Sequence, residues 1–358
     1  MDETPTGEAT TEDRDTQPAG GAEKHFYGGQ AVIEGVMMRG TDRYAVAVRR
    51  EDGEVVVGEK PIENYTDKHK WAKWPLIRGN VAMVDSLILG FAALQFSADV
   101  LAQEENEKAA AKAVEEGKAA PEPDKPATGI GPVLMTLTTV FATVLALGLF
   151  VILPTWAVDW TMGKMATGAS YGESVLRNLV EGCIRLLVIV LYIVCISAMK
   201  YVRRVFEYHG AEHATINCFE AGEAVTEENC LRHSRLHPRC GTAFLLVVVV
   251  VKIILGCFFG WPTPLIRSVI RLALLPVVAG IAYEVIRWAG RHRESLFSRI
   301  LAAPGMLMQV LTTRKPEATQ IQVAIHALAA VACEFDLPSG WQTARRLPVP
   351  LSAQPKSE

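Results

Sequence analysis

The run NLVEGCIRLLVIVLYIVCISAM, residues 178–199, is almost wholly apolar and contains only two charged residues, Glu181 and Arg185. A helix rises about 1.5 Å per residue, so about 20 apolar residues cross the hydrocarbon core of a bilayer. Three more runs have similar length and character: residues 132–154, 242–260 and 266–288. The sequence therefore predicts a mainly α polytopic membrane protein with about four transmembrane helices, and the lipid bilayer is its expected surrounding.

The composition agrees with this fold class. Half of the 358 residues are hydrophobic, a high share for a soluble protein. The formal net charge of −3 gives no basic field of the kind that binds nucleic acid, so no nucleic-acid partner is expected. The seven cysteines are scattered, several of them inside or beside apolar runs, which does not indicate a disulfide framework.

Lysine and arginine set the expected orientation, because loops rich in them stay in the cytoplasm. The loop 200–241 and the segment after the last run are rich in both, whereas the loop WPTPL between the third and fourth runs has neither. The N-terminal stretch also lacks the basic and apolar regions of a signal peptide. We therefore expect a multi-pass protein of the bacterial plasma (inner) membrane, with both termini and the loop 200–241 in the cytoplasm.

A further apolar run, residues 81–98, is interrupted by Asp85, Ser86, Gln95 and Ser97. It is long enough to cross a membrane, but an interfacial or re-entrant helix over 80–98 fits at least as well. A fifth span would place the segment before it on the opposite side from the C-terminal part, which the missing signal peptide disfavours.

The remaining segments differ in composition from these runs. We expect a disordered acidic tail over 1–24, a cytoplasmic Gly-rich loop and β-hairpin over 25–79, a disordered linker over 103–128, cytoplasmic amphipathic helices over 289–335 and a flexible tail over 336–358. The hairpin is a small cytoplasmic α+β element, predicted from alternating apolar and polar residues on both sides of Asp52-Gly53.

The two amphipathic segments have different helix signals. Residues 294–313 are expected to break at Pro304-Gly305. Residues 316–335 open on Pro316-Glu317, a good helix start, and place Ile321, Ile325 and Leu328 on one face.

The loop 200–241 holds four of the eight histidines. In EYHGAEHATINC (207–218), His209 and His213 stand four residues apart, a spacing that places both on one face if the segment is helical. The order H-x-x-E-H adds Glu212, which in an inverted zincin motif acts as a general base. In RHSRLHPRCG, His237 and Cys240 follow. Imidazole and thiolate together suit zinc or iron.

We therefore predict a divalent metal site with His209, His213, His237 and Cys240 as ligands and Glu212 as the catalytic base. A solvated basic loop whose histidines bind only protein atoms is the alternative interpretation. Glu34, in GGQAVIEGVMMRG (28–40), is a second candidate for the base or an extra ligand. In the alternative, this glycine-rich stretch is a tight structural loop and Glu34 pairs with an arginine.

Ionisable residues also occur inside the apolar runs, where they are costly and often functional. Glu181 and Arg185 are four apart, so a helix places them within reach of each other. Lys252 lies in VVVVVKIILG with no local partner, and Arg271 is similar. Pairing that serves packing is favoured over a proton or substrate path.

Five segments, GGQAVIEGVMMRG, YHGAEH, HSRLHPRCGT, LLPVVAGIAYE and PGMLMQVLTT, resemble in sequence and order the YqhQ-like family of bacterial multi-pass membrane proteins. The resemblance extends from about residue 26 to about residue 335. It implies a domain of unknown function that is regarded as a predicted metal-dependent enzyme. Ala214 stands where family members often have a cationic residue, a departure that touches no expected ligand.

Three functions follow in order of preference. The first is a metal-dependent hydrolase at the cytoplasmic membrane face, for which the membrane favours a lipid-linked substrate or a membrane protein. The second is a non-catalytic membrane factor that binds or assembles other membrane proteins, with any metal structural. A transporter ranks third, because no internal repeat is evident in the sequence.

Overall fold

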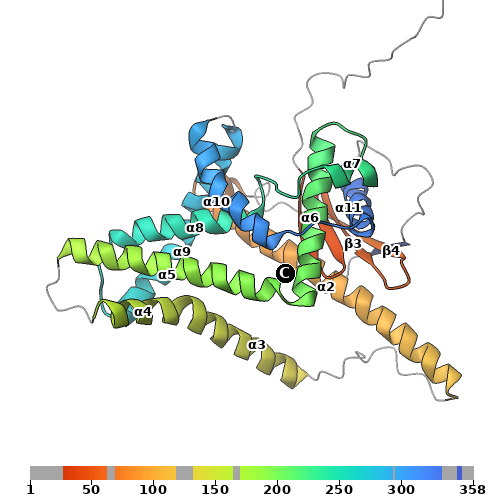
Figure 1. Ribbon diagram of the computed structural model, residues 1–358, viewed down its shortest axis with the longest axis horizontal. Helices are drawn as coiled ribbons and strands as arrows, with labels where there is room; N and C mark the ends of the chain where they lie inside the picture. The colour runs from red at the N-terminus through yellow and green to blue at the C-terminus, as the bar shows by residue number, and fades with distance from the viewer. Residues whose placement is uncertain are drawn as a thin grey trace, which may run out of the picture.

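The computed structural model describes residues 27–62, 69–117, 132–163, 170–292, 295–332 and 345–348. Its elements form two neighbouring parts (Figure 1). One is a small sheet covered by helices, at the right of the view, and the other is a set of long apolar helices at the left. The predicted fold class, a mainly α membrane protein with a small α+β element, is confirmed.

Four strands form an antiparallel meander: β1 (Gly28–Val32), β2 (Gly35–Arg39), β3 (Arg43–Arg49) and β4 (Val55–Pro61). The predicted hairpin around Asp52-Gly53 is the β3–β4 pair. The segment 28–40, predicted as a Gly-rich loop, instead forms the β1–β2 hairpin with Glu34 in its turn. A fifth strand, β5 (Arg345–Pro348), pairs in parallel with β4, so part of the tail predicted to be flexible belongs to the sheet.

Both faces of the sheet are covered, which explains why β2 is apolar without alternation. On one face, Val36 and Met38 pack with α6 (Lys200–Glu220) and α11 (Ala318–Val331). On the other face, Met37 packs with Phe96 of α2 (Ile77–Glu115). Helix α11 begins with a capping box between Glu317 and Gln320, and its predicted apolar face is fully buried.

Helix α2 is longer than the sequence predicts. It continues through residues 103–115, which were expected to belong to a disordered linker. The correction has an electrostatic reason: Glu104 accepts hydrogen bonds from the Glu51 backbone N–H, Lys108 pairs with Glu51 at 2.5 Å, and Glu107 pairs with Arg50 at 2.5 Å. The charged end of α2 thus binds the β3–β4 turn. The rest of the expected linker, like the N-terminal tail 1–24, lies outside the described residues.

The second part of the molecule is built from apolar helices. They are α3 (Pro132–Leu147), the π-helical turn η2 (Gly148–Ile152), α4 (Leu153–Thr161), α5 (Tyr171–Ser197), α8 (Gly241–Cys257), α9 (Pro264–Arg291) and α10 (Leu296–Thr312). A short 3-10 turn, η1 (Lys70–Lys73), precedes α2. Many large apolar side chains are exposed on these helices, among them Phe141, Trp160 and Leu272. Such a surface is stable only against lipid.

Four helical stretches are long and apolar enough to cross a membrane, in agreement with the predicted number: α2, residues 140–161, α5 and α9. The set differs in one member from the predicted runs. Residues 242–260 form α8, which has only 17 residues and is not among the four. Helix α2 takes its place, because it is long and apolar enough to cross a membrane.

The sequence predicts a break at Pro304-Gly305, but α10 continues through these two residues to Thr312. A proline inside a helix costs about 3 kcal/mol relative to alanine. Here α10 packs along α8, and Met308 lies in a small core with Leu246 and Ile193. We attribute the intact helix to this packing.

Candidate metal centre

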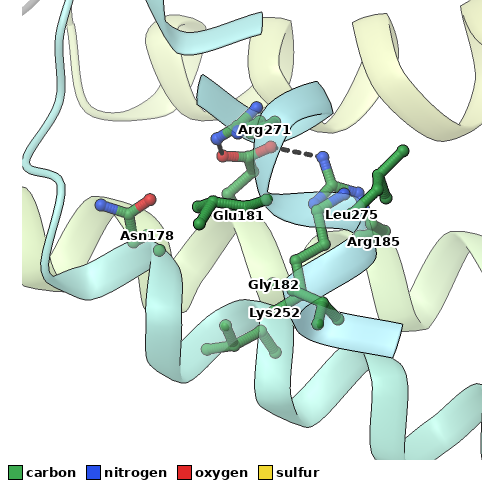
Figure 2. A pocket seen from close by; sticks show the side chains of 11 residues that line it. Asn178, Glu181, Gly182, Arg185, Lys252, Arg271 and Leu275 are labelled. Atoms are coloured by element: carbon green, nitrogen blue, oxygen red, sulfur yellow. Dashed lines mark hydrogen bonds and ion pairs between the residues drawn. The ribbon is translucent and has the colours of Figure 1, made fainter. Parts of the chain in front are cut away.

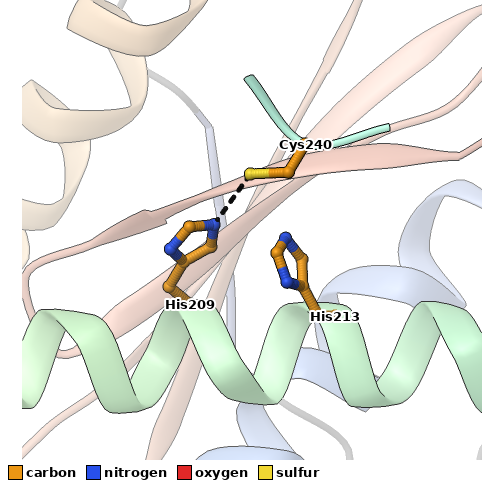
Figure 3. A group of neighbouring side chains, drawn as sticks. All are labelled: His209, His213 and Cys240. Carbon is orange, nitrogen blue, oxygen red and sulfur yellow. Dashed lines mark hydrogen bonds between the residues drawn. The ribbon is translucent and has the colours of Figure 1, made fainter. Parts of the chain in front are cut away.

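The predicted loop 200–241 is mostly helical. It contains α6 and the short α7 (Glu227–Arg232), followed by an irregular return that ends at the start of α8. His209 and His213 lie one turn apart on α6, and the return brings Cys240 in front of them (Figure 3). The two histidines, four residues apart, therefore lie on one face of a helix, as their spacing predicts.

Three potential ligand atoms converge at this point. One ring nitrogen each of His209 and His213 and the sulfur of Cys240 all lie within 4.8 Å of one another. The distance from His209 Nε2 to Cys240 Sγ is 3.2 Å, and the two imidazole centroids are 4.4 Å apart. This is the composition of a three-ligand zinc site with two nitrogens and one sulfur.

Backbone carbonyls fix the tautomer of both histidines. His209 Nδ1 lies 2.8 Å from the Thr312 oxygen, and His213 Nδ1 lies 2.7 Å from the Arg235 oxygen. A carbonyl only accepts, so each Nδ1 carries the proton and each Nε2 keeps a lone pair. Metal-binding histidines usually donate their second nitrogen to such a partner.

His213 shows the best fit to a metal. Its side chain is 1% exposed, and Nε2 has no hydrogen-bond partner among the described residues. Burial lowers the pKa of His213, which keeps the ring neutral. A buried imidazole nitrogen that is neutral, unpartnered and beside a thiol is the kind of atom that binds a cation.

Cys240 occupies the residue before the first turn of α8. Its sulfur lies beside both imidazoles. The Thr242 hydroxyl donates to Sγ, at 3.4 Å. This contact helps to hold the Cys240 side chain toward the two histidines.

Glu212 lies beside the histidines and is buried, with no hydrogen-bond partner for Oε2 among the described residues. Burial raises the pKa of its carboxyl group, and nearby His209 and His237 and the Gly29 backbone act in the opposite direction. A Cβ atom on Gly29 would lie 2.9 Å from Glu212 Cδ and 2.5 Å from the Met37 oxygen. Glycine is therefore required here, and the segment 28–40 lies near the site, as expected.

Two predicted site residues are not part of the three-atom group. His237 is buried, but its Nε2 lies 3.6 Å from Glu220 Oε2 and 3.4 Å from Arg239, and its ring centroid is 5.7 Å from that of His213. Glu34 forms an ion pair with Arg204 and accepts a hydrogen bond from the Tyr208 hydroxyl at 3.2 Å. The alternative interpretation of Glu34, pairing with an arginine, agrees with these contacts.

The sequence did not predict that α10 and the residues after it hold the histidines in place. Thr312 supplies the acceptor for His209, and Gln309 exchanges two hydrogen bonds of 2.8 Å with the backbone of His237. Arg235 donates to the Thr313 oxygen at 2.6 Å. The sequence pointed to this region in one way: PGMLMQVLTT is one of the five segments that resemble the family. That resemblance assigns no role to its residues.

A second group, Cys218, Glu223 and His233, also has its ligand atoms within 4.8 Å of one another. His233 Nε2 lies 3.3 Å from Glu223 Oε2, which makes an ordinary surface ion pair when the histidine is protonated. Burial raises the pKa of the Cys218 thiol, and its sulfur donates to the Ala224 oxygen at 3.6 Å. This group is a weaker candidate, because it offers one imidazole where the first group offers two.

Comparisons with known proteins agree with the resemblance. Residues 74–334 match the family described as "Protein of unknown function (DUF1385)". The chain is 30% identical over 302 residues to the "Uncharacterized protein YqhQ" of Bacillus subtilis (strain 168), a similarity that covers 84% of this chain and 90% of the relative. No solved structure matches significantly.

Proposed function

This chain belongs to the DUF1385 family, and we propose that it is a metal-dependent enzyme of the hydrolase type, with its site at the cytoplasmic face of the bacterial plasma membrane. The observation that carries the proposal is the pair of imidazoles, His213 buried and His209 half-buried, whose Nε2 atoms, with tautomers fixed by Thr312 and Arg235, face the sulfur of Cys240. His209, His213 and Cys240 would hold the ion. Nitrogen and sulfur ligands suit zinc first, and iron second.

The ligand number favours catalysis over a structural role. Structural zinc sites are closed by four protein ligands, whereas catalytic sites use three and leave one position for substrate. Here three side chains converge, and Glu212 lies next to them without being a member of the group. The ion would supply Lewis-acid chemistry, which polarises a bond to oxygen.

Glu212 is the proposed proton acceptor. A general base works best when its pKa lies near the operating pH, and burial raises the pKa of this carboxyl group in that direction. Gly29 lies directly against the carboxyl group, because a Cβ atom there would lie 2.9 Å from Glu212 Cδ. Glu34 has no part in this proposal, because Arg204 and Tyr208 occupy its carboxylate.

The position of the site suggests the class of substrate. Helix α6 begins three residues after α5 ends, and it packs against the sheet (Figure 1). His209 comes nine residues after the start of α6, so it lies within about three turns of the end of a candidate membrane helix. The exposed apolar side chains of α2, such as Leu87 and Phe91, add to the surface that lipid can contact. A lipid-linked substrate or a membrane protein fits this placement.

The shared core also argues for one topology. The sheet, α6 and α11 pack together, so they lie on one side of the membrane. An even number of crossings must then separate the sheet from α6, and α6 from α11. The stretch 140–161 and α5 satisfy the first condition if α2 lies at the interface, and α8 and α9 satisfy the second. Although α8 is only about 25 Å long at 1.5 Å per residue, the bilayer can thin locally to match it.

This topology predicts the result of reporter fusions. Green fluorescent protein joined after residue 358 should fluoresce, and alkaline phosphatase at the same point should be inactive. Alkaline phosphatase inserted at Thr263, between α8 and α9, should be active, since that turn would face the other side. The reverse pattern, or equal signals at both points, would refute the proposed orientation.

The test of the function begins with metal content. Protein purified in detergent without chelator should carry about one zinc or iron per chain by elemental mass spectrometry. The double substitution His209→Ala, His213→Ala should remove it, and His233→Ala, from the second group, should not.

Each other outcome has a definite meaning. Absence of metal from the wild type, even after reconstitution, would sink the proposal and leave the non-catalytic membrane factor in front. Four protein ligands by X-ray absorption spectroscopy, for example with His237 added, would favour a structural ion and the same alternative. Metal lost only in His233→Ala would move the centre to the second group.

A further inference from the structure

A cavity lies inside the apolar helices, at the end of α5 remote from the metal centre. Its polar lining is Asn178, Glu181 and Arg185 from α5, Lys252 from α8 and Arg271 from α9 (Figure 2). Apolar residues of α8 and α9, including Ile253 and Leu274, complete the walls. The space inside it that a water-sized sphere can reach is about 30 Å³, which is room for a small polar group rather than for a whole small molecule.

The lining has an excess of positive charge. Glu181 is 2% exposed and accepts from Arg185 at 2.5 Å, and it also pairs with Arg271. One carboxylate therefore serves two guanidinium groups. Lys252 adds a third cation, and its ammonium has no hydrogen bond or ion pair within the part of the chain that the structure describes. The cavity wall thus carries three cations and one anion.

The next layer of residues does not neutralise this excess. Arg177 pairs with Glu173 at 3.0 Å and lies 4.0 Å from Asp159, which is also 3.8 Å from Arg267. Two more cations are thus matched by two more anions, and the surplus of two positive charges remains. Arg267 is itself buried, stacks 4.0 Å above the Trp261 ring, and leaves Nη1 without a partner among the described residues.

An uncompensated surplus of this kind is expensive inside a membrane. A lysine or arginine near the middle of a transmembrane helix is costly to insert into the membrane. Such residues are retained where they bind something of opposite charge. Guanidinium groups match phosphate oxygens in a planar, bidentate arrangement, and an ammonium adds a point charge. The apolar walls can at the same time contact hydrocarbon.

We propose that this cavity binds a phosphate group, with Lys252, Arg185 and Arg271 as the cationic contacts. The phosphate belongs either to the headgroup of an anionic lipid or to free inorganic phosphate, which offer the same charge to the cavity. The site is separate from the metal centre, because Glu181 lies 16 residues, or about 24 Å of helix, before the end of α5, and the histidines lie beyond that end on α6.

Lys252→Met tests the proposal, because methionine keeps the length of the side chain and removes the charge. Native mass spectrometry would count phosphatidylglycerol molecules retained by the protein from mixed phosphatidylglycerol and phosphatidylcholine nanodiscs. Isothermal titration with sodium phosphate would test the free anion. Loss of one charge-assisted contact should weaken binding about tenfold. Lys112→Met, at an exposed position of α2, should bind as the wild type does.

The two arms identify the source of the phosphate. Weaker retention of phosphatidylglycerol in Lys252→Met, with no response to phosphate, assigns a lipid headgroup, and the opposite result assigns the free anion. Equal binding of both ligands by wild type and Lys252→Met, or binding of neither, would overturn the proposal and leave Lys252 as a side chain that reaches the interface. Metal content should be unchanged in Lys252→Met, so failure here leaves the metal proposal standing.

Discussion

Alanine at position 210 is expected to abolish metal binding and to lower the free energy of unfolding by about 3 kcal/mol, at the upper end of the usual cost of overpacking. A Cβ atom at Gly210 would lie 2.0 Å from the backbone oxygen of Arg314. The same segment donates its Arg314 N–H to the Phe206 oxygen at 2.8 Å and supplies the Thr312 oxygen that binds His209. Moving it away from α6 breaks both contacts.

Helix propensity alone predicts the opposite change in the free energy of unfolding for Gly210→Ala. In an exposed helix, replacing glycine by alanine stabilises by about 1 kcal/mol. Gly290, near the end of α9, has open space around the position of a Cβ atom, so Gly290→Ala is the matched control and should be neutral or slightly stabilising. Thermal unfolding and elemental analysis would decide. A Gly210→Ala protein with full metal content and unchanged thermal stability would show that the segment 312–316 does not support the site.

The two histidines could be predicted as a pair because their relation is local. Residues four apart share one face of any helix, whatever the rest of the chain does. The return from α7 to α8 has no such periodicity, so the sequence offered His237 and Cys240 on equal terms. Only the structure separates them: Gln309 holds the backbone of His237, and Cys240 starts α8 with its sulfur toward His209.

The failures at GGQAVIEGVMMRG and at residues 103–115 have a common cause. Strands β1 and β2 lie in a sheet covered on both faces, so the alternation that reveals a strand is missing from the more buried of the two. The charged end of α2 looks like a linker because its partners, Arg50 and Glu51, lie more than 50 residues before it. Both interactions are long-range, and no window of sequence contains both sides of them.

Two glycines at the site also have a role that the sequence does not reveal. By helix propensity alone, Gly210 weakens the helix that contains it. The glycines of 28–40, Gly29 among them, predict a loop rather than a strand. In the structure each one allows another group to approach: the Arg314 oxygen at Gly210, and the Glu212 carboxyl group at Gly29. A close approach between segments far apart in the chain is visible only after folding.

Cys240→Ser is expected to lower metal affinity at least 100-fold. Mutating a residue that only hydrogen-bonds to a metal ligand typically lowers metal affinity by about 10- to 100-fold. Loss of a ligand itself should cost no less. Serine is among the best residues at the start of a helix, so α8 should still begin at Gly241 and the fold should persist. The most direct readout is cobalt(II) substitution. Wild-type protein should show thiolate-to-cobalt charge-transfer absorption, and the Cys240→Ser protein should not.

Two other cysteines make this test specific. Cys257 lies at the opposite end of α8, so Cys257→Ser controls for changes within the same helix and should leave the absorption intact. Cys218 belongs to the second group, so Cys218→Ser separates the two candidate centres. If Cys218→Ser removed the absorption and Cys240→Ser did not, the unpartnered nitrogen of His213 would need another explanation. Because Cys240 lies beside two imidazoles and Cys218 beside one, we expect the absorption to depend on Cys240.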